Sequence, residues 1–227
     1  MVRRSQRFSP LKNTVSVSSL PSDSGSVTAD ALLICGNAYL GGLVPEIGGK
    51  IMPVSSQQVA TAPLDPTLAE SLLPADFAVE DTNYILDYYR RTADHRLLYG
   101  GGVGYGGADP ADLEAFLRPR LERTFPQLRG VGIEFAWSGQ FALTLTRIPH
   151  VGRLAPGVYF SHGDSGHGVT TTHLLGVVLA EAVAGQLGRF DVWSSLRPLP
   201  FPGGQAFRVP LTALGAVWYD LRDRLGF

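Results

Sequence analysis

The glycine-rich segment at residues 161–170 combines residue types and spacings that suit the binding of an anion. It reads Ser-His-Gly-Asp-Ser-Gly-His-Gly-Val-Thr, and it joins a short apolar run at 157–160 to an apolar, helix-like segment at 170–183. In a strand, glycine turn and helix, the N–H groups of the first helical turn point at a ligand, with the helix dipole behind them. Gly163, Gly166 and Gly168 let the backbone approach that ligand and adopt positive φ. A phosphate or the electron-rich edge of a reduced flavin would fit, and a glycine turn that binds nothing is the alternative.

Three histidines of this region, His162, His167 and His173, raise the alternative of a metal site. Their spacings are five and six residues, so the i, i+4 pair that puts two imidazoles on one helix face is missing. No Cys or Glu completes a ligand set. We therefore predict no metal here, and we expect His167 either beside a flavin or bonded to a backbone carbonyl.

A second glycine motif, Gly102-Val103-Gly104-Tyr105-Gly106-Gly107, fits the dinucleotide fingerprint G-x-G-x-x-G and follows a strand-like run at 96–99. The next helix signals, an Asp and a Pro, come only at 109–112. That distance is too long for the compact loop that cradles a pyrophosphate. We therefore interpret residues 102–107 as a flexible glycine loop near a substrate region.

Length and composition indicate a folded globular protein of one large or two small domains. The chain has 227 residues, of which 44% are hydrophobic and 17% charged, with a net charge of −1. No basic footprint for nucleic acid, no signal peptide and no run of 18 apolar residues is present, so we expect neither nucleic-acid nor membrane partners. The single Cys35 excludes an internal disulfide and favours a cytoplasmic location. It follows an apolar run, so we expect a buried structural thiol.

The hydrophobic pattern predicts an α/β (α+β) chain. Strands are predicted at 14–18, 31–35, 52–60 and 84–89, and a pair at 132–137 and 141–146 around Ser138-Gly139-Gln140. The run at 31–35 is typical of a buried parallel strand. Helices are predicted at 112–125, after the turn at 161–168, and at 213–224.

Several separated blocks resemble FAD-dependent oxidoreductases of the D-amino-acid oxidase superfamily, most closely the gamma-glutamylputrescine oxidase branch. They follow one another in the family's order and cover roughly residues 28 to 227. The upstream blocks are Asn37-Ala38-Tyr39-Leu40, Met52-Pro53-Val54, Asp87-Tyr88-Tyr89-Arg90-Arg91-Thr92 and Arg96-Leu97-Leu98-Tyr99-Gly100-Gly101. The downstream blocks are Trp137-Ser138-Gly139, Ile148-Pro149-His150-Val151-Gly152, Ser165-Gly166-His167-Gly168-Val169 and Phe201-Pro202-Gly203-Gly204.

The resemblance implies an FAD-dependent amine or amino-acid oxidase acting on gamma-glutamylputrescine-like amines. It implies that FAD binds the turn and that the turn's N–H groups stabilise negative charge on the reduced ring; the residues are Gly163, Asp164, Ser165, Gly166, His167 and Gly168. It also implies that residues 1–50 and 151–227 are parts of an FAD-binding βαβ domain, and that 51–150 form a substrate domain with a largely antiparallel sheet.

For the amine pocket, Tyr99 and Trp137 are candidate lining residues, and Arg90 is a candidate contact for a substrate carboxylate. The alternatives are core packing for the two aromatic residues and a surface ion pair for the arginine.

The family normally opens with a βαβ unit that bears G-x-G-x-x-G. No glycine occurs here before Gly25. We therefore expect a truncated chain or half of a split enzyme, inactive alone, whose partner chain supplies the FAD pyrophosphate contacts. The alternative is a non-catalytic remnant or binding module that pairs with another chain.

Overall fold

The computed structural model describes residues 20–22 and 25–225, and the chain forms two compact units. The first contains residues up to 53 together with 141–208, and the second contains 54–140 together with 209–227. The boundaries fall inside β4 (Met52–Thr61), β8 (Ile133–Leu143) and α6 (Gly204–Leu225). The mixed α/β class expected from the sequence is confirmed. The assignment of 1–50, 51–150 and 151–227 to FAD and substrate domains stays a prediction.

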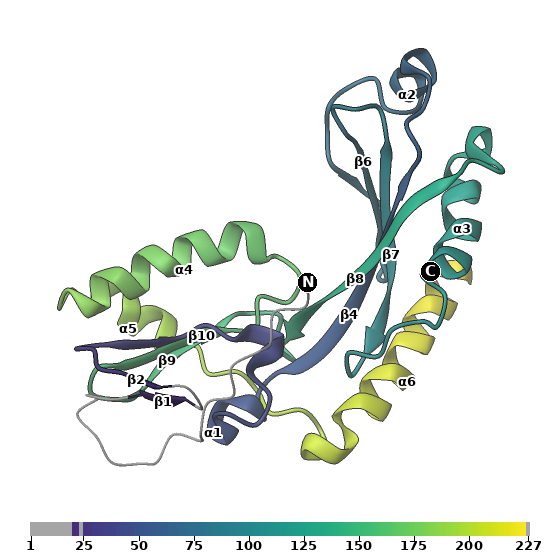
Figure 1. Cartoon of the computed structure of the whole chain (residues 1–227). Helices are drawn as coiled ribbons and strands as arrows, with labels where there is room; N and C mark the ends of the chain where they lie inside the picture. The colour runs from purple at the N-terminus through teal and green to yellow at the C-terminus, as the bar shows by residue number, and fades with distance from the viewer. Residues whose placement is uncertain (1–19, 23–24, 226–227) are drawn as a thin grey trace. The chain divides into compact units, whose positions relative to one another are not determined.

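The first unit is built on a three-stranded sheet with the order β3-β10-β9 (Figure 1). β3 (Leu32–Ile34) runs parallel to β10 (Val158–His162), which pairs antiparallel with β9 (His150–Ala155). The predicted parallel strand within 31–35 is thus confirmed, but the prediction that it is buried was wrong, because β3 lies at the sheet edge and Leu33 is 42% exposed. A hairpin of β1 (Leu20–Ser22) and β2 (Gly25–Val27) precedes the sheet. The predicted strand at 14–18 lies outside the described residues.

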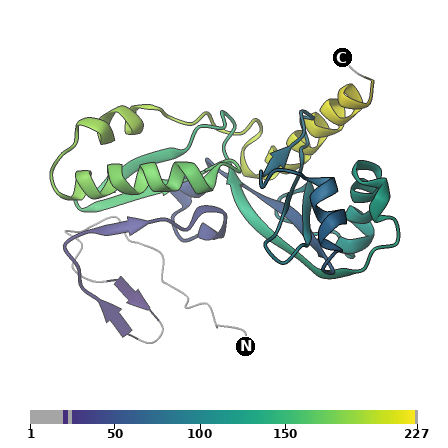
Figure 2. The ribbon, with the colours of Figure 1, turned by 90° about the horizontal axis from the view of Figure 1, so that it is seen from above.

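Helices cover both faces of this sheet. α4 (Gly168–Val183) runs along one face, as Figures 1 and 2 show, and α5 (Gly188–Ser195) follows it. Their shared core comprises Val151, Tyr159, Leu175, Val178, Leu179, Ala182 and Phe190. η1 (Asn37–Leu40) and α1 (Pro45–Gly48) contribute to the other core, which comprises Ile34, Ala38, Leu40, Val44, Ile47, Ile51, Ala142, Val158 and Phe160. Because both faces are covered, β10 is apolar at successive positions rather than alternating.

The second unit contains a five-stranded sheet with the order β5-β6-β7-β4-β8. β5 (Val79–Glu80), β6 (Asp87–Arg91), β7 (Leu97–Tyr105) and β4 pair antiparallel in turn. α2 (Pro66–Leu72), α3 (Leu113–Thr124) and η2 (Pro126–Leu128) complete this unit. Its core packs Val59, Leu97 and Tyr99 against Leu117 and Leu121 of α3. α3 begins where predicted, because the Asp112 carboxylate accepts a hydrogen bond from the Ala115 N–H at 2.9 Å.

Three sequence predictions for the second unit were wrong. β8 is one continuous strand, whereas two strands around Ser138-Gly139-Gln140 were predicted. β7 continues through Tyr105, so the expected flexible loop at 102–107 is strand up to that residue. The predicted strand at 84–89 lies instead at Asp87–Arg91.

The glycines of β7 leave room for side chains of neighbouring elements. A Cβ at Gly100 would collide with the Tyr88 ring, and one at Gly102 would collide with Phe116 of α3. The motif thus serves close packing of a strand.

Two further expectations need correction. The last helix begins at Gly204, nine residues before the predicted start at 213, and includes Pro210. Cys35 was expected to be buried, but it lies just after β3 and is exposed. Within the described ranges, no helix is both long and apolar enough to cross a membrane.

Candidate cofactor-binding site

The turn between β10 and α4 has a backbone that requires glycine at specific positions. β10 ends at His162 and α4 begins at Gly168, as the strand–turn–helix pattern predicted. Gly163 and Gly166 have φ values of +77° and +92°, where side chains are strained. Ser165 also has a positive φ, +55°, which is uncommon for a residue with a side chain.

Hydrogen bonds from distant segments hold this turn in place. The Gly163 N–H donates to the Asn37 Oδ1 at 3.0 Å, and the Ser165 N–H donates to the Ala142 carbonyl at 2.9 Å. The buried Ser165 hydroxyl accepts from the Thr144 N–H at 3.2 Å and donates to the Gly163 carbonyl at 3.2 Å. These contacts stabilise the left-handed backbone of Ser165 against its intrinsic strain.

The start of α4 presents backbone donors to solvent. Gly166 and His167 are exposed, and His167 is the N-cap residue without a side-chain capping bond. The first helical hydrogen bond runs from the Thr171 N–H to the His167 carbonyl at 3.2 Å. The N–H groups of residues 168–170 therefore have no helical acceptor, which is the arrangement that binds anions.

Asp164 lies inside this turn with one carboxylate oxygen unsatisfied. A Cβ at Gly168 would collide with its Oδ2, so the carboxylate occupies the space beside the helix start. Its Oδ1 is buried and has no hydrogen-bond partner among the described residues. Asp164 lines a cavity of about 130 Å³ together with Asn37, His162 and Thr171. A buried acceptor without a partner, on a residue that lines a cavity, indicates a place for a ligand's hydroxyl or N–H group.

His162, the residue before the turn, forms a pair with His150. The His150 Nδ1 and the His162 Nε2 are 2.9 Å apart, and His162 is 5% exposed. Burial and the neighbouring His150 lower the pKa of His162 to about 3. Burial and the charge of Lys50 lower the pKa of His150 to about 4. Both imidazoles are therefore neutral at pH 7, and they share one N–H donor.

His173 and Cys35 are two further candidate metal ligands or nucleophiles near the turn. His173 Nδ1 contacts the Val169 carbonyl at 2.6 Å on the exposed side of α4. In the part of the chain that the structure describes, no cluster of three or more His, Cys, Asp or Glu residues is arranged to hold a metal ion. Cys35 lines the same cavity as His162, and partial burial of the thiol raises its pKa. It is therefore protonated at neutral pH and a poor nucleophile.

The three candidate residues for an amine pocket all belong to the second unit. Tyr99 is fully buried in the core, and its hydroxyl is 3.0 Å from the Thr124 Oγ1. Trp137 on β8 is 40% exposed. Arg90 on β6 is exposed and forms an ion pair with Asp76 at 3.2 Å. The structure thus gives Tyr99 a packing role and leaves Trp137 and Arg90 accessible.

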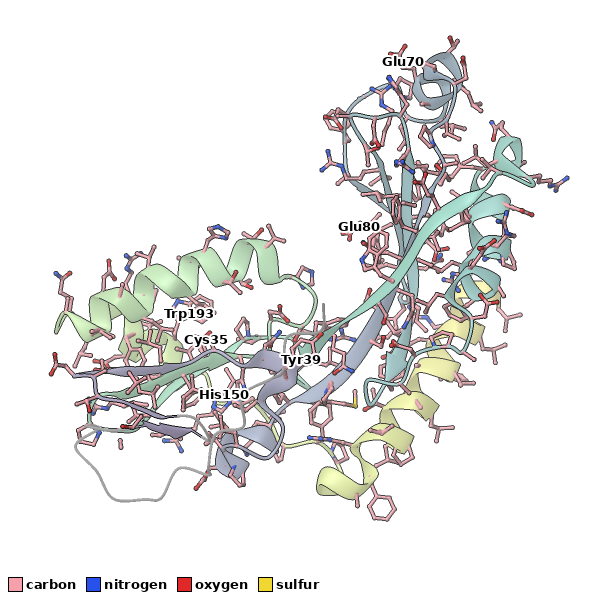
Figure 3. All side chains as sticks on the ribbon, viewed as in Figure 1. Cys35, Tyr39, Glu70, Glu80, His150 and Trp193 are labelled. Carbon is pink, nitrogen blue, oxygen red and sulfur yellow. The ribbon has the colours of Figure 1, made fainter. Side chains whose placement is uncertain are left out.

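The supports of the turn were not identified from the sequence as functional. Asn37 lies 126 positions before Gly163, and Thr144 lies 21 positions before Ser165. A weak signal was available for Asn37, because Asn tolerates the left-handed backbone (φ 45°) that it adopts after β3. Figure 3 labels Cys35, which follows β3, and Tyr39, which lies within η1; the two flank Asn37 in the sequence.

Comparisons with curated proteins agree with the family suggested by the sequence blocks. The gamma-glutamylputrescine oxidoreductase of Escherichia coli is 54% identical over 203 residues, which cover 89% of this chain and 48% of that protein. The probable oxidoreductase OrdL of Haemophilus influenzae is 36% identical over 88% of this chain and 46% of its own length. The chain thus spans about half the length of these curated relatives.

Solved structures show the same fold at low sequence identity. Glycine oxidase from Geobacillus kaustophilus superimposes with a TM-score of 0.67 at 21% identity, over 82% of this chain and 51% of that one. L-Proline dehydrogenase from P. horikoshii gives a TM-score of 0.62 at 19% identity, over 78% and 49% of the two chains. The family model described as FAD dependent oxidoreductase matches residues 8–182. The chain therefore belongs to the FAD-dependent oxidoreductase family, and FAD is the cofactor that this membership assigns.

Proposed function

We propose that this chain supplies the flavin-binding turn and a substrate-facing sheet of an FAD-dependent amine oxidoreductase. The observation that carries the proposal is the turn at 163–168. It combines free backbone donors at the start of α4 with a buried, orphaned Oδ1 on Asp164, a residue that lines a cavity. Donors and an acceptor in one place suit a ligand that has both kinds of hydrogen-bonding group.

The residues present fit FAD. Gly166 is exposed, and a Cβ there would come no closer than 3.8 Å to another residue, so a flat ring system can approach the backbone at this point. Gly163 and Gly168 instead make room for Thr144 and for the Asp164 carboxylate. In this proposal the N–H groups of residues 168–170 hold the electron-rich edge of the ring, and Asp164 accepts a hydroxyl or N–H donor. FAD when bound supplies the acceptor for the hydride equivalent taken from the amine. The protein's own contribution is binding, orientation and stabilisation of negative charge at the helix start.

We propose that the pyrophosphate contacts come from a segment outside residues 1–227, on this polypeptide or on a second one. β3 is an edge strand of its sheet as described, and Leu33 within it is 42% exposed. α4 exposes large apolar side chains, namely Val169, Leu174, Val177 and Val183. An open strand edge next to an apolar helix face is a surface that another βαβ segment can cover.

For the substrate, we propose an amine of the gamma-glutamylputrescine type. The support is the 54% identity to a protein named for that compound. Trp137 and Arg90 are the accessible candidates for contacts with it, Arg90 through the substrate's carboxylate. Arg90 would then exchange its exposed partner Asp76 for the substrate, at little cost because surface ion pairs contribute about 0–1 kcal/mol.

An absorption spectrum tests the proposal in separable steps. Residues 1–227 are purified alone and together with the part of the Escherichia coli relative that this chain does not match, each with added FAD. We expect a tightly bound flavin spectrum only with the complement, and anaerobic bleaching of the flavin band by gamma-glutamylputrescine.

Each contrary result overturns a different part of the proposal. Tight flavin binding by residues 1–227 alone removes the need for a complement. A stable complex that never binds flavin favours the non-catalytic binding module. A bound flavin that other amines bleach, but gamma-glutamylputrescine does not, overturns the substrate assignment.

A further inference from the structure

A second and larger cavity, of about 510 Å³, lies in the first unit beside β9 and α5. β9 is the edge strand of its sheet on the side away from β3. Phe160 and Phe190 give the cavity apolar walls, and the buried Val151 and Gly152 form part of its lining. Its volume is within the range of about 300–1,000 Å³ that is typical of small-molecule sites. Figure 3 labels His150, which also lines the cavity, and Trp193, which lies on α5.

Three cationic side chains line this cavity: Lys50 after α1, Arg153 on β9 and Arg197 after α5. None of them takes part in an ion pair among the described residues. Other described arginines, such as Arg129, also have no ion pair, whereas six pair with carboxylates, so what distinguishes this cavity is that three unpaired cations line it together; the six paired arginines are Arg90, Arg91, Arg96, Arg118, Arg120 and Arg189. Cations that converge on one cavity without a counter-charge raise the local positive potential and favour an anionic ligand.

The remaining polar groups of the lining leave this positive charge in place. Asp191 is the one acidic lining residue, so the cavity carries a net two positive charges. The Ser194 hydroxyl is engaged with the Asp191 carbonyl at 3.2 Å. His150 is neutral at pH 7, and its Nδ1 is used by His162 at 2.9 Å. Its Nε2 is the ring nitrogen left for a ligand.

We propose that this cavity binds a small dianion with carboxylate or phosphate groups. The two charges of the ligand match the net charge of the lining. The arginine guanidinium groups suit bidentate contacts with carboxylate or phosphate oxygens, and Lys50 adds a point charge. The site does not depend on the flavin proposal, because no residue of the turn at 163–168 lines it.

Calorimetric titration of residues 1–227 with inorganic phosphate and, separately, with succinate tests the site. We expect saturable binding of one ligand per chain that weakens as NaCl is added. The ligand that binds more tightly identifies the phosphate or the dicarboxylate as the preferred class. Arg153→Ala and Arg197→Ala should each weaken binding about tenfold or more, as expected for the loss of a charge-assisted hydrogen bond.

Two matched variants make the test specific. Asp191→Asn removes the one opposing charge and should tighten binding. Arg129→Ala removes an exposed arginine of the second unit that forms no ion pair with any described residue, and it should leave the affinity unchanged. Arg153 and Arg197 are exposed, so their replacement spares the core, and circular dichroism checks the fold of every variant. The proposal is overturned if neither ligand binds, or if Arg129→Ala weakens binding as much as the two cavity variants.

Discussion

The carboxylate of Asp164 occupies the space beside Gly168 that a side chain at residue 168 would otherwise fill. Gly168 begins α4 with a free backbone N–H, and Asp164, four residues before it, carries the orphaned acceptor. This relationship gives the glycine a role that helix propensity does not explain, because alanine is the better helix former.

We predict that Gly168→Ala displaces the Asp164 carboxylate and weakens FAD binding about tenfold or more in the complemented protein, as loss of a charged hydrogen bond would. Flavin fluorescence titration measures the affinity. The matched control is Gly215→Ala inside helix α6, where a Cβ would meet no atom within 4 Å. That change should leave FAD binding intact and raise stability by about 0.5–1 kcal/mol. Equal FAD affinity in both variants would refute the role of the Asp164–Gly168 pair.

Gly166→Val should abolish flavin binding, because Gly166 is exposed on the turn at a φ of +92°. Valine there is strained and blocks the approach of a ring to the backbone. Gly130→Val is the control, since Gly130 also has a positive φ (+73°) and open space around it but lies in the second unit. Thermal unfolding should show a similar loss of stability in both variants, and only Gly166→Val should lose the flavin spectrum. A normal spectrum would mean that the turn is purely structural.

The His150–His162 pair should make the protein less stable as the pH falls from about 6.5 towards 4. Their folded pKa values, about 4 and about 3, lie below the ordinary value of 6.5. In that interval the unfolded chain binds protons that the folded chain rejects, so acidification favours unfolding. Where the folded chain binds one proton fewer than the unfolded chain, the free energy of unfolding falls by about 1.4 kcal/mol for each pH unit of acidification. His150 contributes less than this, because it is partly open to solvent.

Urea denaturation at pH 7, 6 and 5 measures this slope. His162→Asn should flatten it, whereas His173→Asn, on the exposed side of α4, should not change it. Hydrogen bonds lower the pKa values of Asp94, Asp109 and Glu181 from 3.8 or 4.5, so these carboxyl groups contribute little to the slope between pH 7 and 5. A slope that His162→Asn leaves unchanged would contradict the prediction.

Tyr99→Phe should lower stability by about 1 kcal/mol and leave the KM for the amine unchanged in the complemented enzyme. The hydroxyl of this fully buried residue is 3.0 Å from the Thr124 Oγ1, and the loss of one such hydrogen bond has about that cost. Burial also raises the pKa of Tyr99, so it is not a base at neutral pH. Trp137→Phe is the comparison. Trp137 is accessible, so this substitution should raise the KM for the amine with little change in stability. A higher KM for Tyr99→Phe would contradict this prediction and indicate that Tyr99 lines the amine pocket.

The sequence predicted those elements whose signals are local. The apolar runs at 31–35 and 157–160, with glycines after the second, define β3, β10 and the start of α4. Asp112 marks the start of α3 by a bond to the N–H three residues later. Within β8, the residues Ser138-Gly139-Gln140 have the composition of a hairpin turn, but they lie in a strand. The Ser138 hydroxyl donates to Asp109 at 2.7 Å, and the Gln140 amide donates to the Gly107 carbonyl at 3.0 Å, so partners about 30 positions away override the turn preference.

The candidate site also combines a part that local sequence predicts with a part that depends on distant residues. The glycine turn itself was predictable, because its spacing is local. Its supports were not, since Asn37 reaches Gly163 and His150 reaches His162 only once β3, β9 and β10 have paired. The orphaned oxygen of Asp164 depends on side-chain packing, which no sequence pattern encodes.

The apolar surface of α4 should make residues 1–227 self-associate when no complement is present. Val177 is 50% exposed, Leu174 one turn before it is 44% exposed, and β3 is an edge strand of the same unit. Contiguous exposed apolar side chains and an open strand edge both promote association. Light scattering after sizing chromatography, at several protein concentrations, should show a mass that rises with concentration. Val177→Asn should reduce that rise. Phe77→Asn removes a larger side chain that is 69% exposed in the second unit, and it should have no such effect, which separates the α4 surface from apolar exposure in general. A monomer at every concentration would show that α4 needs no covering segment, and the proposal of a complementing βαβ unit would lose its structural support.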